Sequence, residues 1–215
     1  MDNQIPWLIL GLVWVINFFI SWLNARTVGV MWSETKFIGG WKRFMAWMGA
    51  IMSASGFTWC YMIVLLLGAY YLQPIKPDEP PLLDMETVSS GFALGYLLII
   101  PGIIFSGFMI WIDSLVQAWR RRDAPSISIA AWNTFAQIHN TYSMMRGLPE
   151  VWESVGKLGG KGSGKSKGAI LVIILVLLAI ISGVLTTWAI INHYAGTRTI
   201  ERPSQHKFKH RVSAE

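Results

Sequence analysis

Charged residues are scarce in this sequence: they account for 14% of its 215 residues, against about 25% in an ordinary soluble domain. They are missing from four long apolar runs, 7–23, 44–72, 91–112 and 169–191. A helix needs about 20 predominantly apolar residues to cross the hydrocarbon core of a bilayer. The pattern therefore excludes a single soluble domain and predicts an all-α membrane protein with four transmembrane helices.

Cysteine is nearly absent as well. The single Cys60 cannot form a disulfide within the chain, and its apolar neighbours indicate a small packing residue and not a redox centre. Lysine and arginine are absent before the first run, and no small-residue cleavage site follows it. We therefore expect residues 7–23 to be a retained transmembrane helix and not a cleaved signal peptide.

Acidic and basic side chains are also absent from the four runs, which argues against a proton-coupled transporter or an intramembrane carboxylate protease. Asn17 lies within the first run, and its amide predicts either a hydrogen bond to another helix or a packing contact without a function. The four histidines lack the spacing of a metal site. Residues 159–166 match a phosphate-binding loop in sequence, but no strand precedes them. We expect no enzyme activity, cofactor or metal.

Small residues recur at helical spacing in the second and third runs. In the second run they are spaced by 3, 4, 3 and 4 positions, and they comprise Ala46, Gly49, Ser53, Gly56 and Cys60. In the third run they comprise Gly91, Gly95, Gly102 and Ser106, and Pro101 indicates a kink. Because small residues let membrane helices approach closely, we expect these two seams to face each other in a packed hairpin.

Polar segments separate the runs and divide the chain. In the three-span region 1–113, residues 24–43 form a basic connector in which Gly29, Gly39 and Gly40 indicate turns. Residues 73–90 form an acidic, proline-rich loop. The sizeable polar region 114–168 precedes the last run, and a basic tail over 192–215 follows it.

The polar region 114–168 predicts an amphipathic helix that starts near Pro125. Its apolar positions recur at helical spacing: Ile129, Trp132, Phe135, Ile138, Tyr142 and Met145. The helix is not apolar enough to span, so we expect it to lie on the cytoplasmic membrane surface or against a partner. We expect a second short helix near Pro149 and a flexible Gly/Lys/Ser linker over 156–168.

The basic residues predict an orientation. With four alternating spans, residues 24–43 and 114–168 share one side with twelve Lys and Arg, and the other side carries six. Positive charge stays in the cytoplasm, so both termini are expected outside, in a bacterial inner membrane, although the basic tail opposes this. The basic clusters comprise Lys42, Arg43, Arg120, Arg121 and Arg122. We interpret them as contacts to anionic lipid at the cytoplasmic face and not as a nucleic-acid site.

These observations favour a non-enzymatic membrane subunit that packs through its small-residue seams against other subunits or itself, in an assembly of the secretion, conjugation, phage or defence type. The alternative is a homo-oligomeric pore with a mildly polar lining, for which the candidates are Asn17, Ser53, Ser55, Thr58 and Ser106. An enzyme or transporter would need a buried polar cluster, and the runs offer little beyond Asn17, Pro101 and the flanking Asp113.

Overall fold

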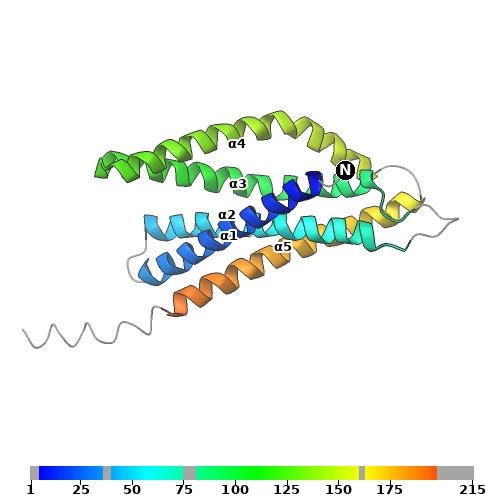
Figure 1. Cartoon of the computed structure of the whole chain (residues 1–215), viewed down its shortest axis with the longest axis horizontal. Helices are drawn as coiled ribbons and strands as arrows, with labels where there is room; N and C mark the ends of the chain where they lie inside the picture. Colours follow the sequence, from blue (N-terminus) through cyan, green and yellow to red (C-terminus); the bar gives the residue numbers. More distant parts are fainter. Residues whose placement is uncertain (1–4, 36–39, 75–80, 160–162, 198–215) are drawn as a thin grey trace, which may run out of the picture.

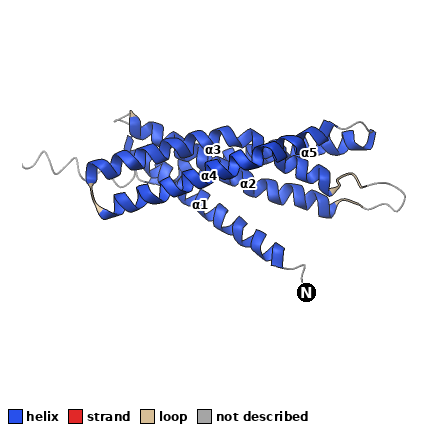
Figure 2. Ribbon diagram, turned by 90° about the horizontal axis from the view of Figure 1, so that it is seen from above, coloured by secondary structure: helices blue, strands red, loops and turns tan. Residues whose placement is uncertain are grey.

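The structure is a computed structural model that describes residues 5–35, 40–74, 81–159 and 163–197. It contains five α-helices, which are α1 (Ile5–Thr35), α2 (Trp41–Leu72), α3 (Met85–Arg121), α4 (Ala124–Gly156) and α5 (Ser163–Thr197), and a short 3-10 helix, η1 (Lys157–Gly159) (Figures 1 and 2). Four of them, α1, α2, α3 and α5, are long and apolar enough to cross a membrane. The predicted all-helical, multi-pass membrane architecture is confirmed at this level.

The helices lie side by side in an elongated bundle (Figure 1). At one end, where α1 begins and α2 stops, the ring of Trp7 lies 5.7 Å from that of Tyr71. At the other end, Gly29 of α1 approaches Ile191 and Tyr194 near the end of α5. Thus α1, α3 and α5 run in one direction, and α2 and α4 run back. We call the end at which α1, α3 and α5 stop the arginine end, because it carries Arg26, Lys42, Arg43 and Arg120–Arg122.

The first helix is longer than predicted. The expected turn at Gly29 is wrong, because α1 continues to Thr35. A Cβ at Gly29 would lie 2.7 Å from the carbonyl oxygen of Ile191, so this glycine allows α1 to approach α5 closely. The expected turn at Gly40 is confirmed: this residue precedes α2 with φ +72°, a conformation that favours glycine. Gly39 lies outside the described residues.

The third helix begins six residues before the predicted span, at Met85. Asp84 caps it, because its carboxylate accepts a hydrogen bond of 2.7 Å from the backbone N–H of Thr87. The Gln73 side chain donates to the carbonyl of Leu83 and accepts from its N–H, at 2.6 and 2.8 Å. These bonds join the two ends of the proline-rich loop, of which residues 75–80 lie outside the description. The helix continues through Pro101 to Arg121.

The polar region is more regular than predicted. A single helix, α4, includes Pro149, so the expectation of a separate short helix there is wrong. The expected linker is partly helical, because η1 and the start of α5 flank residues 160–162, which are not described. Most importantly, α4 packs back along α3, so the region that begins at the arginine end finishes at the opposite end (Figure 1). The bundle therefore starts with α1 at one end and stops with α5 at the other, whereas a strict four-span alternation predicts both on one side.

The small residues pack, but not seam against seam. On α2, added Cβ atoms at Gly49 and Gly56 would meet Val28 and Ser21 of α1. On α3, Gly95 and Gly102 leave room for the side chains of Met62 and Ile51, which lie on a different face of α2. The expected hairpin of α2 and α3 exists, but the α2 seam faces α1. Its remaining members, Ala46, Ser53 and Cys60, are fully buried, as is Ser106 of α3, and Gly91 of α3 faces Val172 of α5 and Leu66 of α2.

The apolar core joins α2, α3 and α5. It contains Leu66, Leu83, Val88, Val172 and Val176. In contrast, α4 buries three residues in its 33 and lies at the edge of the bundle. The central helices therefore contain the core, and α4 presents most of its surface outward.

Candidate functional site

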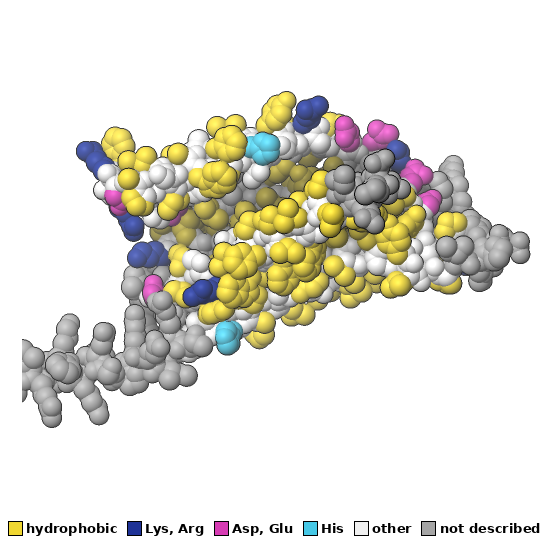
Figure 3. All heavy atoms as spheres, in the orientation of Figure 1, with side chains coloured by type: hydrophobic (Ala, Val, Ile, Leu, Met, Phe, Trp, Pro, Cys, Tyr) yellow, Lys and Arg dark blue, Asp and Glu magenta, His cyan; other side chains and the backbone are white. Residues whose placement is uncertain are grey.

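The arginine end forms a cationic and aromatic surface. The guanidinium carbon of Arg43 lies 4.6 Å from the ring centre of Trp32, and that of Arg122 lies 5.6 Å from the ring centre of Trp119. Arg26 contacts the rings of Trp22 and Tyr194 at 5.9 and 5.6 Å. These distances suit cation–π contacts. Figure 3 shows Lys and Arg side chains gathered at this end, beyond the hydrophobic surface that covers the middle of the bundle.

A hollow of about 320 Å³ lies among α1, α2 and α3 at the same end. Its polar wall contains Lys42, Arg120 and Arg121, which come together from two helices. Asp113 is held in this wall, because it accepts hydrogen bonds of 2.6 Å from the indole N–H of Trp41 and from the Gln117 amide. Three of the basic residues singled out in the sequence thus line one hollow, together with the acidic Glu34 and Asp113, while Arg43 and Arg122 contact indoles at the same end of the bundle.

A tight turn connects α3 to α4. Arg122 has φ 54°, and its N–H donates to the carbonyl of Ala118 at 2.9 Å, which ends α3. Asp123 then accepts a hydrogen bond of 2.8 Å from the backbone N–H of Ser126, which starts α4. The hydrogen bonds from the side chain and backbone of Ser126 lower the pKa of Asp123 below its usual value. With two residues between the helices, α4 is directed back along α3.

The small and polar face of α4 contacts α3. Trp111 donates its indole N–H to the hydroxyl of Thr134 at 2.8 Å. Gly107 leaves room for the Gln137 side chain, whose Oε1 would lie 2.8 Å from an added Cβ. Ala130 is 5% exposed on the same face. The apolar face predicted from the sequence is therefore turned away from the bundle.

The outward face of α4 is an unpacked apolar stripe, with its members between 57% and 70% exposed: Ile129, Trp132, Phe135, Ile138, Tyr142 and Met145. Polar side chains are exposed beside it near the middle of the helix, where His139, Asn140 and Ser143 lie. The ring of His139 stacks on Phe135, with centroids 6.2 Å apart. Aromatic anchors interspersed with hydrogen-bonding groups are typical of a protein interface.

Asn17 makes an interhelical contact. Its amide donates to the carbonyl of Gly56 at 2.9 Å and to the sulfur of Cys60 at 3.2 Å, which links α1 to α2. Trp14 adds a bond of 3.0 Å from its indole N–H to the carbonyl of Cys60. This cluster has the character of a packing contact between helices.

We expect Asn17→Leu to lower the free energy of unfolding by about 1 kcal/mol, because interhelical hydrogen bonds in membranes contribute about 0.6–2 kcal/mol. Ser55→Ala is the control, since the hydroxyl of Ser55 donates within its own helix to Ile51, at 2.9 Å. Titration with a denaturing detergent, followed by circular dichroism, measures both. Equal losses in the two variants would contradict an interhelical role for Asn17.

Three of the hydroxyls proposed for a pore lining bond within their own helices. Ser53, Ser55 and Ser106 are buried and donate to carbonyls of their own helices, at 2.8, 2.9 and 2.6 Å. A contact that the sequence did not reveal joins α2 to α5, where the hydroxyls of Tyr61 and Thr186 lie 2.9 Å apart. The sequence does not predict this hydrogen bond, because a tyrosine and a threonine within apolar runs form no distinctive pattern.

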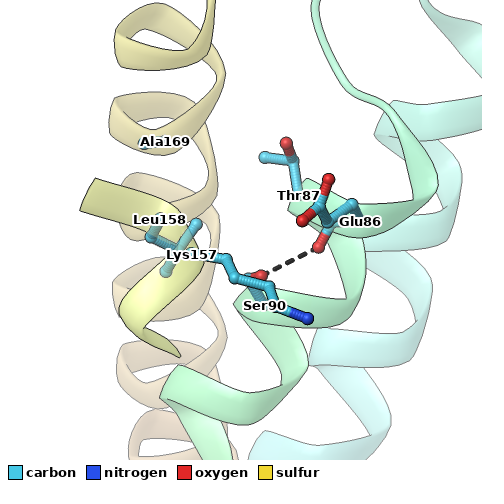
Figure 4. A pocket seen from close by; sticks show the side chains of 6 residues that line it. All are labelled: Glu86, Thr87, Ser90, Lys157, Leu158 and Ala169. Atoms are coloured by element: carbon cyan, nitrogen blue, oxygen red, sulfur yellow. Dashed lines mark hydrogen bonds between the residues drawn. The ribbon is translucent and has the colours of Figure 1, made fainter. Parts of the chain in front are cut away.

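Within the described ranges, no three His, Cys, Asp or Glu side chains lie close enough to hold a metal ion. At the end opposite the arginines, a pocket between α3, η1 and α5 has a volume of about 10 Å³, room for a single water (Figure 4). Ser90 donates there to the carbonyl of Glu86 at 2.9 Å, and the nearby Lys157 pairs with Glu153 at 3.5 Å. Residues 159–166 match a phosphate-binding loop in sequence, and their side chains lie outside the described part of the structure.

The chain matches no protein-family model, no curated protein and no solved structure.

Proposed function

We propose that this chain is a non-enzymatic, multi-pass subunit of a membrane assembly, and that it joins its partner through the outward face of α4. The main support for this proposal is that α3 and α5 are parallel to each other. Both helices are long and apolar enough to cross a membrane. The chain between two parallel spans must return through the bilayer. The 33 residues of α4, about 50 Å, are long enough for that crossing, but α4 is not one of the four helices apolar enough to span by themselves, so the proposal replaces the expected surface position with a crossing that depends on a partner.

If α4 crosses the membrane, another helix must shield its exposed polar side chains from lipid. His139, Asn140 and Ser143 lie midway along the helix and are exposed, so lipid tails would surround them at the centre of the bilayer. Polar side chains at that depth are unfavourable unless another helix supplies hydrogen-bond partners. A transmembrane helix from another subunit or from a second copy would satisfy them and would bury the aromatic stripe.

The charge distribution supports the same placement. Twelve of the eighteen Lys and Arg residues lie in segments that begin or finish at the arginine end, when the tail that follows α5 is included. Positive-inside bias then places the arginine end in the cytoplasm of a bacterial inner membrane. With a fifth crossing, the basic tail starts on the cytoplasmic side, and the conflict in the four-span orientation disappears.

Native mass spectrometry after extraction in a mild detergent tests the interface. We expect the wild-type chain in a complex, and we expect Phe135→Ala to lower the assembled fraction about tenfold, because truncated aromatic anchors often cost more than about 1.4 kcal/mol of binding. Asn140→Leu should also dissociate the complex, since it removes the polar group that needs a partner.

Phe105→Ala is the matched control, because Phe105 is 51% exposed on α3, away from the stripe. A wild-type chain that is monomeric in mild detergent and in bilayers would reject the proposal. So would a loss of assembly as large in Phe105→Ala as in Phe135→Ala. A complex made only of this chain would lead next to a flux measurement in liposomes, which tests the pore alternative.

A further inference from the structure

A groove runs from the arginine end towards the middle of the bundle, between α1, α2 and α5. Its volume is about 370 Å³. Three indoles line it, those of Trp32, Trp47 and Trp188, and the deeper wall on α2 is made of Ala50 and Ala54. Trp47 and Trp188 are 56% and 65% exposed, so the groove opens sideways towards the space that lipid occupies. Most of its lining is apolar, and on α2 it extends from Ala46 to Ala54, about 12 Å along the helix.

One hydroxyl in the groove lacks a partner. Thr187 lines the groove and is 4% exposed, and its Oγ1 has no hydrogen bond within the described part of the chain. Its neighbour Thr186 is bonded to Tyr61, and the buried serines of α2 are bonded to their own helix. A buried, unbonded hydroxyl is destabilising by about 1–3 kcal/mol. Because Thr187 lines the groove, its hydroxyl is a candidate donor to a ligand oxygen there.

The mouth of the groove is polar, and a cation lies beside it: Arg43 does not line the groove, but it lies about one helical turn before Trp47 on α2. Arg43 lies 4.6 Å from the ring centre of Trp32, which in turn packs edge to face on Trp47 at 5.6 Å. The Asn192 amide lines the same mouth. Thr187 is five residues before Asn192, which places it about 7.5 Å deeper along α5. From the mouth inward, the groove thus offers a cation and an amide, then a hydroxyl, then apolar walls.

We propose that this groove binds one anionic glycerophospholipid. The phosphate contacts Arg43 and Asn192, an ester carbonyl accepts a hydrogen bond from Thr187, and an acyl chain lies against Ala50 and Ala54. The order of groups in the groove matches the order of phosphate, ester and acyl chain in the lipid. The inference depends on the membrane placement of the bundle and not on the α4 interface, so the two proposals can fail separately.

Lipid retention by the full chain tests the site. The delipidated protein in detergent is titrated with phosphatidylglycerol or with phosphatidylcholine of the same acyl chains, and native mass spectrometry counts the lipids that stay bound. We expect one phosphatidylglycerol to be retained in preference to phosphatidylcholine. Arg43→Gln should weaken phosphatidylglycerol binding about tenfold, since it removes a charge-assisted hydrogen bond to the phosphate. Thr187→Val should weaken both lipids about fivefold.

Arg122→Gln is the matched control, because Arg122 also contacts an indole at the arginine end, but that indole, Trp119, does not line the groove, whereas the Trp32 indole beside Arg43 does. Ala50→Phe fills the groove and should abolish retention of both lipids. Thermal unfolding of each variant shows that the comparison concerns folded protein, and Thr187→Val, which is nearly isosteric, serves if Ala50→Phe does not fold. Equal retention of the two lipids by the wild type would overturn the inference, as would equal losses in Arg122→Gln and Arg43→Gln.

Discussion

Gly183→Ala is expected to lower the free energy of unfolding by about 3 kcal/mol, the upper part of the range for overpacked sites. The added Cβ would lie 2.7 Å from the backbone nitrogen of Thr58 and 2.8 Å from the carbonyl oxygen of Ala54. Both atoms belong to the backbone of α2, so no side chain can rotate to make room. α5 would have to move away from α2, which it contacts over much of its length.

The measurement is unfolding of the purified chain in mixed micelles of mild and denaturing detergent, followed by circular dichroism. Gly68→Ala is the control, because a Cβ at Gly68 meets no atom within 4 Å. This control should be neutral or more stable by about 0.5–1 kcal/mol, since alanine favours a helix over glycine. Similar losses in both variants would show that the α2–α5 contact is looser than described.

The second large effect concerns the two ends of α4. Cysteines replace Ala124 and Gly156 in a Cys60→Ala background, and intact cells are treated with a maleimide that cannot cross membranes. If α4 crosses the bilayer, the Gly156→Cys chain is labelled from outside and the Ala124→Cys chain is labelled only after permeabilisation. Both positions are exposed, and a Cβ at Gly156 meets no atom within 4 Å.

Reference positions fix the two sides independently of α4. Leu72→Cys, at the end of α2, is 85% exposed and should behave as Gly156→Cys does. Lys42→Cys, at the start of the same helix, should behave as Ala124→Cys does. Labelling of both α4 positions from one side would contradict the crossing and would restore the four-span alternation.

The number of apolar helices could be predicted from the sequence, but their ends could not. Charge and polarity mark where a helix leaves the hydrocarbon, not where its hydrogen bonding stops. α1 has 31 residues, about 47 Å, and thus extends beyond a hydrocarbon core of about 30 Å. The polar residues 24–43 predict a connector between two helices. In the structure, residues 24–35 continue α1 and supply Arg26 and Trp32 to the arginine end.

The sequence was less informative about which helices pack against each other. A seam such as Gly49 and Gly56 shows that some helix approaches closely, but nothing in its spacing distinguishes α1 from α3. For α4, the periodic apolar residues lie together on the exposed side of the helix. The side that packs on α3 is the small and polar one, with Thr134 bonded to Trp111. In water the apolar face would be buried. In the proposed crossing α4 lies beside lipid, where that preference is absent and hydrogen bonds determine which face packs on α3.

The two-residue turn at Arg122 and Asp123 also bears on biogenesis. α4 carries Arg146, Glu150 and Glu153, and charged residues oppose insertion of an isolated helix by about 2.5–3.5 kcal/mol each near its centre. In the proposed crossing, we expect α4 to enter the bilayer together with α3, as the second arm of a helical hairpin in which Trp111 is bonded to Thr134. The order of synthesis suits this, because α3 emerges from the ribosome first and gives α4 a surface on which to fold.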